Sequence, residues 1–345
     1  MSASRFLPAE ALLKAGVTSG AYPGGVLEVG RSEGVSWRSV AGRLTYEPGS
    51  SAVTESTIYD LASLTKVIVT TSLAMRLVDS GRLSLASKIS AHIPAWKDPT
   101  RTHTTVRDLL EHCSGLSGWL PLYREHTGRR AFEHAIAAGA LEYAPWTRSI
   151  YSDLGFMLLG FIVHDAGEAS LADQFAGVST ALHFAPLESL RPGIAPTEID
   201  PEDGRSLGGE VHDENARALG GVAGHAGLFG TVAAVGEFAR LVLRTYTVET
   251  ILGRPETLRR FVTRSTVPAS SRALGWDTML PTSSCGTRMS SRAIGHVGFT
   301  GTSLWIDPGR DVYVALLTNR VHPTRDNNAI RELRPAIHDA VMGAM

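Results

Sequence analysis

The sequence predicts an α+β fold, in which helices flank one antiparallel sheet built from both ends of the chain and a second lobe is all-helical. Two short hydrophobic segments near the N-terminus read as strands, at residues 24–30 and 35–42. Three more occur near the C-terminus, at residues 292–298, 302–307 and 312–318. The long segment between the two groups reads as helices and loops. We therefore expect the N-terminal and C-terminal strands to share a single sheet.

The first two strands form a predicted hairpin that follows an N-terminal helix. Residues 9–20 are predicted to be helical, and the hairpin turn is predicted at Arg31–Gly34. The next helix is predicted to begin at Ser63, after an extended approach through Tyr59–Ala62. It should end near Gly81, since glycine readily adopts the left-handed conformation that stops a helix.

The rest of the chain is predicted to contain further helices and one functional loop. Helices are expected at residues 105–110, 153–166, 231–247 and 327–342. Thr104 or Thr105 is a suitable cap for the first of them. Residues 208–230 are rich in glycine, which is needed where the backbone geometry is unusual, so we interpret them as a functional loop.

This pattern predicts two domains. Residues 1–81 and 226–345 are expected to form the sheet domain, and residues 82–225 a helical domain that carries active-site loops. Ligand sites often lie at such an interface, so we expect the site between the two.

The composition excludes several classes of function. The chain has 345 residues, of which 43% are hydrophobic, and its formal net charge is −1 without a long run of one sign. Neither nucleic acid nor an anionic membrane is therefore an expected partner. Cys113 and Cys285 lie far apart and match neither a disulfide framework nor a metal-ligand pattern, so no metal is expected.

The sequence contains no segment with the hydrophobic length that crosses a bilayer. The first ten residues also lack the hydrophobic stretch of a secretory signal. We expect a cytoplasmic protein, or a periplasmic one if a leader has been removed from this chain. The sequence does not indicate the oligomeric state.

Ser63 and Lys66 are the first candidate catalytic residues. Residues three apart lie on one face of a helix, and the start of a helix favours developing negative charge. A partly desolvated lysine can lose its proton near neutral pH and serve as a base for the serine hydroxyl. Alone, the pattern is weak evidence, because many helices have an N-cap serine followed by a solvated lysine.

Tyr151 and Asp153 stand where a loop enters a predicted helix. A tyrosine at this junction can face a cleft, and a nearby lysine would lower its phenol pKa so that it could relay a proton. The alternative is a packed tyrosine beside an aspartate that caps the helix.

Residues 295–302 carry three glycines on a predicted strand that passes into a tight bend. Glycine allows backbone amides to approach a substrate carbonyl, and an amide at the edge of the sheet together with that of Ser63 would make an oxyanion hole. The alternative is a strand with glycines at a bulge and an isolated His296 in the core or on the surface.

Other polar residues have weaker cases. His225 lies in the glycine-rich segment and either lines the cleft or is structural. His112 is expected to be buried or capping, and Cys113 to be packing. Residues 212–214 match no familiar metal site, so we interpret them as a network that orders a loop.

The order S-x-x-K, Y-x-D, H-x-G resembles the class C-like branch of the β-lactamase and penicillin-binding-protein superfamily. This branch includes class C β-lactamases, D-alanyl-D-alanine carboxypeptidases, D-aminopeptidases and family VIII esterases. The likeness covers about residues 20–340. Further stretches that are similar to the family lie at residues 105–116, 211–216, 224–231 and 305–308.

The resemblance implies a β-lactamase/transpeptidase-like fold and a role for each matching residue. Ser63 would be the acylated nucleophile, Lys66 its proton acceptor or electrostatic activator, and Tyr151 the general base. His296 would orient Tyr151 or contact a substrate carboxylate. The residues expected to bind the oxyanion or the substrate are Phe299, Gly298, Thr300, Asp153 and His225. The family needs no metal or organic cofactor.

Three departures from the family pattern bear on the substrate. His296 and Val297 replace the usual lysine and threonine, which removes a permanent cation and a hydroxyl donor. Asp153 replaces an asparagine; it cannot donate a hydrogen bond, and it could pair with Lys66 and keep that lysine protonated. These changes favour an ester or a small amide over penicillin.

The sequence thus predicts a serine hydrolase that cleaves an ester or amide of a small molecule through an acyl-serine intermediate, specifically a β-lactamase-like esterase. One alternative is a β-lactamase, a D-alanyl-D-alanine carboxypeptidase or a D-aminopeptidase. Another is a non-catalytic binding protein of the same fold.

Overall fold

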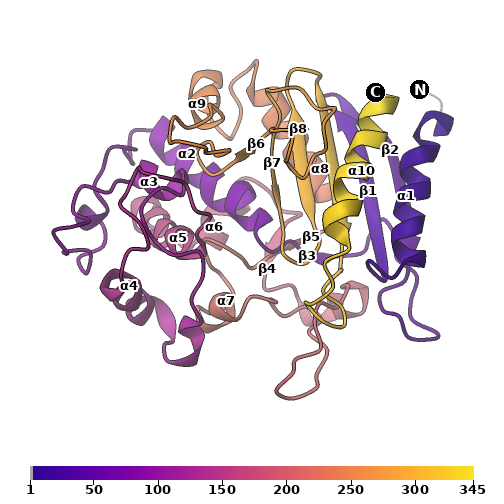
Figure 1. Cartoon of the computed structure of the whole chain (residues 1–345), viewed down its shortest axis with the longest axis horizontal. Coiled ribbons are helices and arrows are strands. Elements are labelled where there is room, and N and C mark those ends of the chain that lie inside the picture. Colours follow the sequence, from indigo (N-terminus) through magenta and orange to yellow (C-terminus); the bar gives the residue numbers. More distant parts are fainter. Residues whose placement is uncertain (1–2) are drawn as a thin grey trace.

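A six-stranded antiparallel sheet dominates the computed structural model, which describes residues 3–345 (Figure 1). Its strand order is β2-β1-β9-β8-β7-β6. The strands are β1 (Gly24–Arg31), β2 (Gly34–Gly42), β6 (Asp277–Thr278), β7 (Ile294–Val297), β8 (Ser303–Asp307) and β9 (Val312–Thr318). N-terminal β1 pairs directly with C-terminal β9, with Val26 opposite Leu317. The prediction of one sheet built from both chain ends is therefore confirmed.

The expected helices are present within two or three residues of their predicted bounds. The α-helices are α1 (Leu7–Thr18), α2 (Ser72–Asp79), α3 (Val106–Leu110), α4 (Gly128–Ala138), α5 (Asp153–Gly167), α6 (Leu171–Ala176), α7 (Glu214–Ala218), α8 (Val232–Thr245), α9 (Pro255–Phe261) and α10 (Ile330–Ala344). Short 3₁₀ turns lie at Ala3–Phe6, Ile89–Ala91, Leu122–Arg124 and Glu188–Gly193. Thr105 precedes α3, and its amide donates to the Asp108 carboxylate, as in a capping box.

The helix after Ser63 differs from the expectation in its first half. Lys66–Thr71 forms a π-helix, which continues into α2. The Ser72 hydroxyl donates to the Val67 carbonyl five residues earlier, in keeping with this wider winding. Such insertions are frequent at functional sites, and this one carries Lys66.

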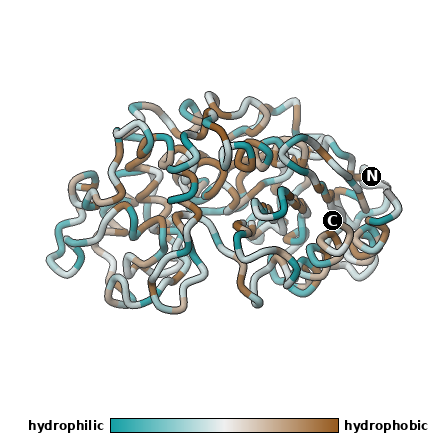
Figure 2. The backbone as a smooth tube through the Cα atoms, turned by 90° about the horizontal axis from the view of Figure 1, so that it is seen from above, coloured by the Kyte–Doolittle hydropathy of each residue, from teal (hydrophilic) through white to brown (hydrophobic). Residues whose placement is uncertain are grey.

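Helices cover both faces of the sheet, and β9 shows how the sequence serves both. Val312, Val314 and Leu316 contact the core beneath α1 and α10. Tyr313 and its alternate neighbours pack into the larger core that contains α8 and continues into the helical lobe. Because successive side chains of a strand point to opposite faces, a strand covered on both sides is hydrophobic throughout. In Figure 2 hydrophobic stretches run through the interior, whereas hydrophilic ones are frequent on outer loops.

The middle of the chain had been expected to contain only helices and loops, but it also contains short strands. A second, three-stranded sheet has the order β3-β5-β4, with β3 at Tyr59–Asp60, β4 at His183–Phe184 and β5 at Leu228–Gly230. Strands of two or three residues are too short to show alternation, which is why β3, β4, β5 and β6 were missed as strands. The predicted loop at residues 208–230 likewise contains α7 and β5.

The division into two domains at the predicted boundaries stays a prediction, and its residues 1–2 lie outside the described residues. The segments that surround the pocket described below pack closely against one another. A Cβ atom at Gly224 would lie 2.2 Å from the Phe156 carbonyl oxygen on α5, so glycine is required for this approach. Within residues 3–345, none of the helices has the length and hydrophobicity needed to cross a membrane.

Candidate active site

A strained turn presents the Ser63 side chain. Ala62 adopts a left-handed conformation with φ of 47°, which costs free energy for a residue other than glycine. The buried Asp60 carboxylate stabilises the turn, since it accepts hydrogen bonds from the Ala62 amide and the His212 amide, both at 2.8 Å. The end of β3 and the segment before α7 therefore fix the backbone that precedes Ser63.

Lys66 lies fully buried behind Ser63, where its ammonium group makes two hydrogen bonds and one ion pair. Its Nζ lies 2.9 Å from Ser63 Oγ, 3.0 Å from the His225 carbonyl oxygen and 2.6 Å from Asp153 Oδ1. A protonated lysine has three donors and no acceptor, so this arrangement matches the ammonium form.

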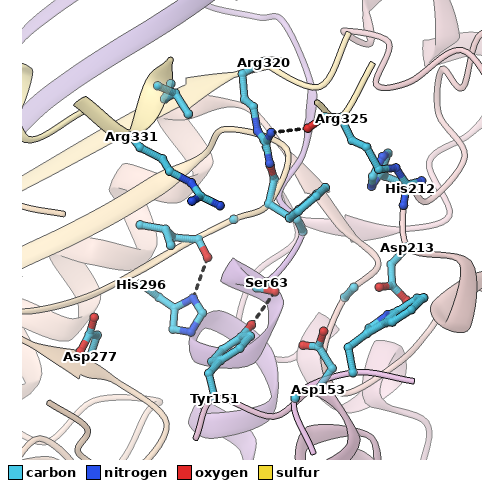
Figure 3. Close-up of a pocket in the computed structure, with 18 of the residues that line it drawn as sticks. Ser63, Tyr151, Asp153, His212, Asp213, Asp277, His296, Arg320, Arg325 and Arg331 are labelled. Atoms are coloured by element: carbon cyan, nitrogen blue, oxygen red, sulfur yellow. Dashed lines mark hydrogen bonds between the residues drawn. The ribbon is translucent and has the colours of Figure 1, made fainter. Parts of the chain in front are cut away.

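The Tyr151 side chain points toward Ser63, as Figure 3 shows. Its phenol donates to Ser63 Oγ at 2.8 Å. Its ring lies 5.0 Å from the ring of buried His112, and the Arg272 guanidinium lies 5.3 Å from its centre. His112 in turn accepts a hydrogen bond from the Ser152 amide. The loop before α5 is therefore held so that the phenol points at the serine.

The protonation of this group differs from the simplest expectation. Burial lowers the pKa of Lys66, but Asp153 and Tyr151 raise it, and the net pKa lies above the ordinary value. Burial raises the pKa of Tyr151 more than Lys66 lowers it, so the expected drop of the phenol pKa is wrong. At neutral pH the resting site therefore holds an ammonium and a phenol.

Asp153 does not cap α5, because the Ser152 hydroxyl does so by accepting from the Gly155 amide. Instead its carboxylate reaches Lys66, as the sequence had suggested, and also lines the pocket.

The bend after β7 lies against the turn before Ser63. The Thr302 hydroxyl donates to the Leu61 carbonyl at 3.1 Å, and a Cβ atom at Gly298 would lie 2.6 Å from that carbonyl oxygen. Within residues 3–345, neither the Ser63 amide nor the Phe299 amide donates to another group of the chain. Both residues line one pocket, so both amides are available to a substrate oxygen.

Thr300 does not line the pocket, contrary to the expectation. It is buried, and its hydroxyl donates to the Asp60 carbonyl at 2.8 Å. Thr300 therefore ties the bend to β3, and its place in the sequence gave no sign of this inward direction.

His296 lines the pocket beside Tyr151, with the two ring centres 5.6 Å apart. Its Nδ1 lies 2.9 Å from the Val297 carbonyl oxygen, which can only accept, so Nδ1 carries the proton. Burial, together with Arg272 and Lys66, holds the pKa of His296 well below its usual range. The ring is thus neutral, and its Nε2 is an acceptor that cannot bind a substrate carboxylate.

Of the two interpretations of His225, the structural one agrees with its position, and the one that places its side chain in the cleft does not. Its side chain is buried outside the pocket lining, and its Nε2 lies 2.8 Å from the Asp213 carboxylate. Burial raises the pKa of Asp213, but His225 and other partners lower it below the usual range overall. His225 reaches the site through its backbone carbonyl, which accepts from Lys66.

The segment at residues 212–214 forms the expected ordering network. His212 lies 3.0 Å from Glu198, and Arg325 pairs with both Glu198 and Glu214. Within the described residues, no group of three or more histidines, cysteines, aspartates or glutamates is arranged to hold a metal ion.

Ser63 opens into a pocket of about 700 Å³. Half-exposed Phe299 and Trp119 give it hydrophobic surface near the serine. Five arginines also line it, namely Arg272, Arg320, Arg325, Arg331 and Arg334. The sequence analysis missed these arginines, together with the contact of His112 with Tyr151, because only the tertiary fold brings them to the site.

Replacing Asp153 with asparagine tests the control of the site by charge. Asp153→Asn removes the anion that raises the pKa of Lys66, so the pair Lys66–Tyr151 should lose a proton at lower pH. The alkaline rise of kcat/KM for an ester substrate should shift down by roughly 1–3 pH units. The measurement is the pH–rate profile of Asp153→Asn. The control is the profile of Asp173→Asn, which changes an exposed carboxylate on α6. An unshifted profile in Asp153→Asn would contradict the assigned electrostatics.

Comparisons with known proteins agree with this geometry. The Beta-lactamase family model matches residues 9–338. One relative is the "Putative D-alanyl-D-alanine carboxypeptidase" of Escherichia coli K12, to which the chain is 34% identical over 311 residues. The match covers 78% of this chain and 70% of the relative. The chain is 29% identical over 343 residues to an N-acetylmuramyl-L-alanine amidase of Bacillus subtilis, covering 87% and 78%.

Solved structures show the same fold at low sequence identity. EstCE1, described as a hydrolase with promiscuous acyltransferase activity, superposes with a TM-score of 0.76 at 18% identity, covering 97% of this chain and 98% of its own. A class C β-lactamase from Rhodobacter sphaeroides gives a TM-score of 0.76 at 17% identity with the same coverage. The β-lactamase/transpeptidase-like architecture expected from the sequence is therefore confirmed.

Proposed function

The chain belongs to the Beta-lactamase family, and on this basis we propose that it is a serine hydrolase that cleaves an ester or amide through an acyl-serine intermediate. The observation that carries the proposal is the position of Ser63 Oγ, held between Lys66 Nζ at 2.9 Å and the Tyr151 hydroxyl at 2.8 Å inside a pocket. A serine within hydrogen-bonding reach of a basic group is the arrangement that nucleophilic catalysis requires.

In the proposed acylation step, the active form has lost one proton from the Tyr151–Lys66 pair. The phenolate oxygen of Tyr151 takes the Ser63 proton as Oγ bonds to the substrate carbonyl carbon. The Lys66 ammonium stabilises the charge on both oxygens. The carbonyl oxygen becomes an oxyanion, which the Ser63 and Phe299 amides hold until the intermediate collapses. The phenol of Tyr151 then gives its proton to the departing alcohol or amine.

Deacylation would follow the same path with water as the nucleophile. Tyr151 takes a proton from water, the hydroxide bonds to the acyl carbon, and the Ser63 oxygen leaves and recovers the proton. Each step balances without a metal or an organic cofactor, because the only species transferred are the acyl group and protons.

An ester or small amide is the substrate class that the site favours over a β-lactam. Neutral His296 stands where the family usually has a cationic lysine, so this side chain offers no positive charge to the carboxylate of a β-lactam. Asp153 accepts hydrogen bonds only and is engaged with Lys66, so it offers no donor to a substrate amide.

A second candidate is the cleavage of an amide in a cell-wall-derived fragment. The names of two relatives favour it, since one is called a D-alanyl-D-alanine carboxypeptidase and the other an N-acetylmuramyl-L-alanine amidase. The large pocket has room for a peptide or sugar substituent.

A substrate panel distinguishes these activities. We expect kcat/KM for 4-nitrophenyl butyrate, divided by its rate constant with hydroxide, to exceed the corresponding value for nitrocefin by about tenfold or more, the effect of one missing charged contact. Higher relative efficiency on nitrocefin would contradict the esterase assignment. D-alanyl-D-alanine peptides and muramyl-L-alanine serve as the amide substrates. Absence of turnover on every substrate, together with no covalent labelling by a fluorophosphonate, would favour a non-catalytic binding protein.

A further inference from the structure

Three arginines on one side of the pocket, which we call the arginine wall, have no acidic partner. They are Arg320, which follows β9, and Arg331 and Arg334 on the first turns of α10. Within residues 3–345, none of the three forms an ion pair with an aspartate or glutamate. Figure 3 shows Arg320 and Arg331 across the pocket from Tyr151 and Asp153.

The other charged groups of the pocket do not compensate this wall, because most are already engaged. Arg325 pairs with Glu198 at 2.6 Å and Glu214 at 2.7 Å. Asp153 pairs with Lys66, and Asp213 contacts His225. Glu198 and Glu214 thus share Arg325, and Asp153 and Asp213 each have their own partner, whereas the arginine wall has no acidic partner. Asp277 also lines the pocket and forms no ion pair within residues 3–345, but none of the three arginines pairs with it.

The guanidinium groups of the wall keep donors for a ligand. Arg334 is only 6% exposed, its Nε has no partner among the described residues, and its single hydrogen bond is a long one of 3.5 Å to the Thr302 carbonyl. Arg331 is exposed and lines the pocket, and its side chain makes no hydrogen bond or ion pair with the described residues. Such planar, multi-donor groups suit carboxylate and phosphate oxygens.

The Arg320 side chain connects two segments of the chain. Its Nε donates to the Phe299 carbonyl at 2.8 Å, and its Nη1 donates to the carbonyls of Arg325 and Asn327. It thus connects the bend that carries the Phe299 amide to the chain that leads into α10. Its charge still faces Arg331 and Arg334 without a counter-ion.

Burial and the neighbouring arginines both act on the pKa values of the wall. Burial, with the nearby charge of Arg331, lowers the pKa of Arg320 to about 10. Burial, with the charges of Arg320 and Arg331, lowers the pKa of Arg334 to about 10. Both remain cations at neutral pH, so three like charges face one space, and an anion placed there would relieve their repulsion.

We propose that the arginine wall is a subsite for a substituent of the substrate that carries more than one negative charge, as a phosphate monoester or two carboxylates. The proposal rests on the proposed hydrolase function, since the wall and Ser63 line the same pocket. A single carboxylate would match only one of three cations, which is why we infer a multiply charged group. Neutral His296 contributes no charge, so the recognition of an anion would rest on α10 and the chain before it.

A series of activated esters with the same leaving group tests the subsite. It comprises 4-nitrophenyl butyrate, the mono-4-nitrophenyl ester of glutaric acid and that of tricarballylic acid, whose acyl groups carry zero, one and two negative charges. Each kcat/KM is divided by the rate constant with hydroxide. We expect the ratio of dianionic to neutral ester to be well above one and to fall roughly 10- to 100-fold in Arg331→Gln, as when a charged hydrogen bond is lost.

The control variant is Arg130→Gln, which removes the same charge from an exposed position on α4 outside the pocket and should leave the ratio unchanged. Arg334→Gln is measured as well, with its melting temperature, because this side chain is buried. A wild-type ratio near one, or an unchanged ratio in both Arg331→Gln and Arg334→Gln, would overturn the subsite.

A binding assay separates failure of the subsite from failure of the proposed hydrolase. Inorganic phosphate binds without turnover, so its effect on the melting temperature can be compared with chloride at equal ionic strength. We expect phosphate to stabilise the wild-type protein and Ser63→Ala alike, but not Arg331→Gln. Equal stabilisation of the wild type and Arg331→Gln would contradict the subsite. If no ester is turned over and phosphate still stabilises only proteins with the intact wall, the hydrolase assignment fails and the anion site stands.

Discussion

Ser63→Ala is expected to abolish ester turnover, with kcat/KM reduced on the order of 10⁴- to 10⁶-fold. Alanine leaves the turn at Ala62 and the ion pair of Lys66 with Asp153 in place, and it removes the Ser63 oxygen that contacts both Lys66 and Tyr151. Without this oxygen no acyl-enzyme can form. The measurement is steady-state hydrolysis of 4-nitrophenyl butyrate by folded protein, verified by circular dichroism and melting temperature.

Ser56→Ala is the matched control for this variant. Ser56 is an exposed serine seven positions before the nucleophile, and its hydroxyl makes no hydrogen bond within the described residues. Its activity should equal that of the wild type. Turnover by Ser63→Ala within tenfold of the wild type would show that another group is the nucleophile.

Tyr151→Phe is expected to reduce kcat/KM about 10²- to 10⁴-fold, the range for loss of acid–base assistance. Phenylalanine retains the ring that packs against His112 and below Arg272, so the shape of the pocket should persist. Only the oxygen 2.8 Å from Ser63 Oγ is lost. The measurement is kcat/KM between neutral and alkaline pH, where the rise that reports on the Tyr151–Lys66 pair should also change.

Tyr46→Phe provides the control, since the Tyr46 hydroxyl donates to the Gly20 carbonyl, away from the pocket. It should leave both the rate and the pH profile as in the wild type. If Tyr151→Phe retained full turnover, the proton would have to move by another route, and Lys66 would be the remaining candidate.

The local part of the site was predictable from the sequence for a geometric reason. Ser63 and Lys66 are three residues apart in one helical segment, so their proximity follows from helical geometry alone, even with a π-helix beginning at Lys66. Tyr151 was a candidate from its place where a loop enters a predicted helix, but only the resemblance to a known family linked it to Ser63, since no local pattern joins residues 88 positions apart. The strands of the main sheet were predictable where they are long enough to show hydrophobic character.

The remaining features of the site depend on side-chain directions and burial, which only the tertiary fold determines. Thr300 was expected at the cleft, yet its hydroxyl points inward to Asp60, because the bend packs on the turn before Ser63. The phenol pKa of Tyr151 was expected to fall near a cation, but the depth of burial decides the sign. No sequence pattern showed that Arg331 and Arg334, on a helix at the other end of the chain, face the serine pocket.

One feature of the site unites these observations, namely that Lys66 beside the nucleophile has a carboxylate partner, whereas the three arginines of the opposite wall have none within residues 3–345. The Asp153 carboxylate holds Lys66 as an ammonium, and His296 is neutral. The site thus resembles its family in the position of the nucleophile and differs in where positive charge is offered to a substrate.

The central claim is that Ser63 becomes covalently acylated, and adduct mapping tests it most directly. The protein is treated with a fluorophosphonate, and in parallel quenched during turnover of a slowly hydrolysed ester; it is then digested and analysed by mass spectrometry. The account predicts a single adduct on Ser63 in both experiments, and none in Ser63→Ala. An adduct on a different residue, or hydrolysis of esters by Ser63→Ala at the wild-type rate, would contradict it.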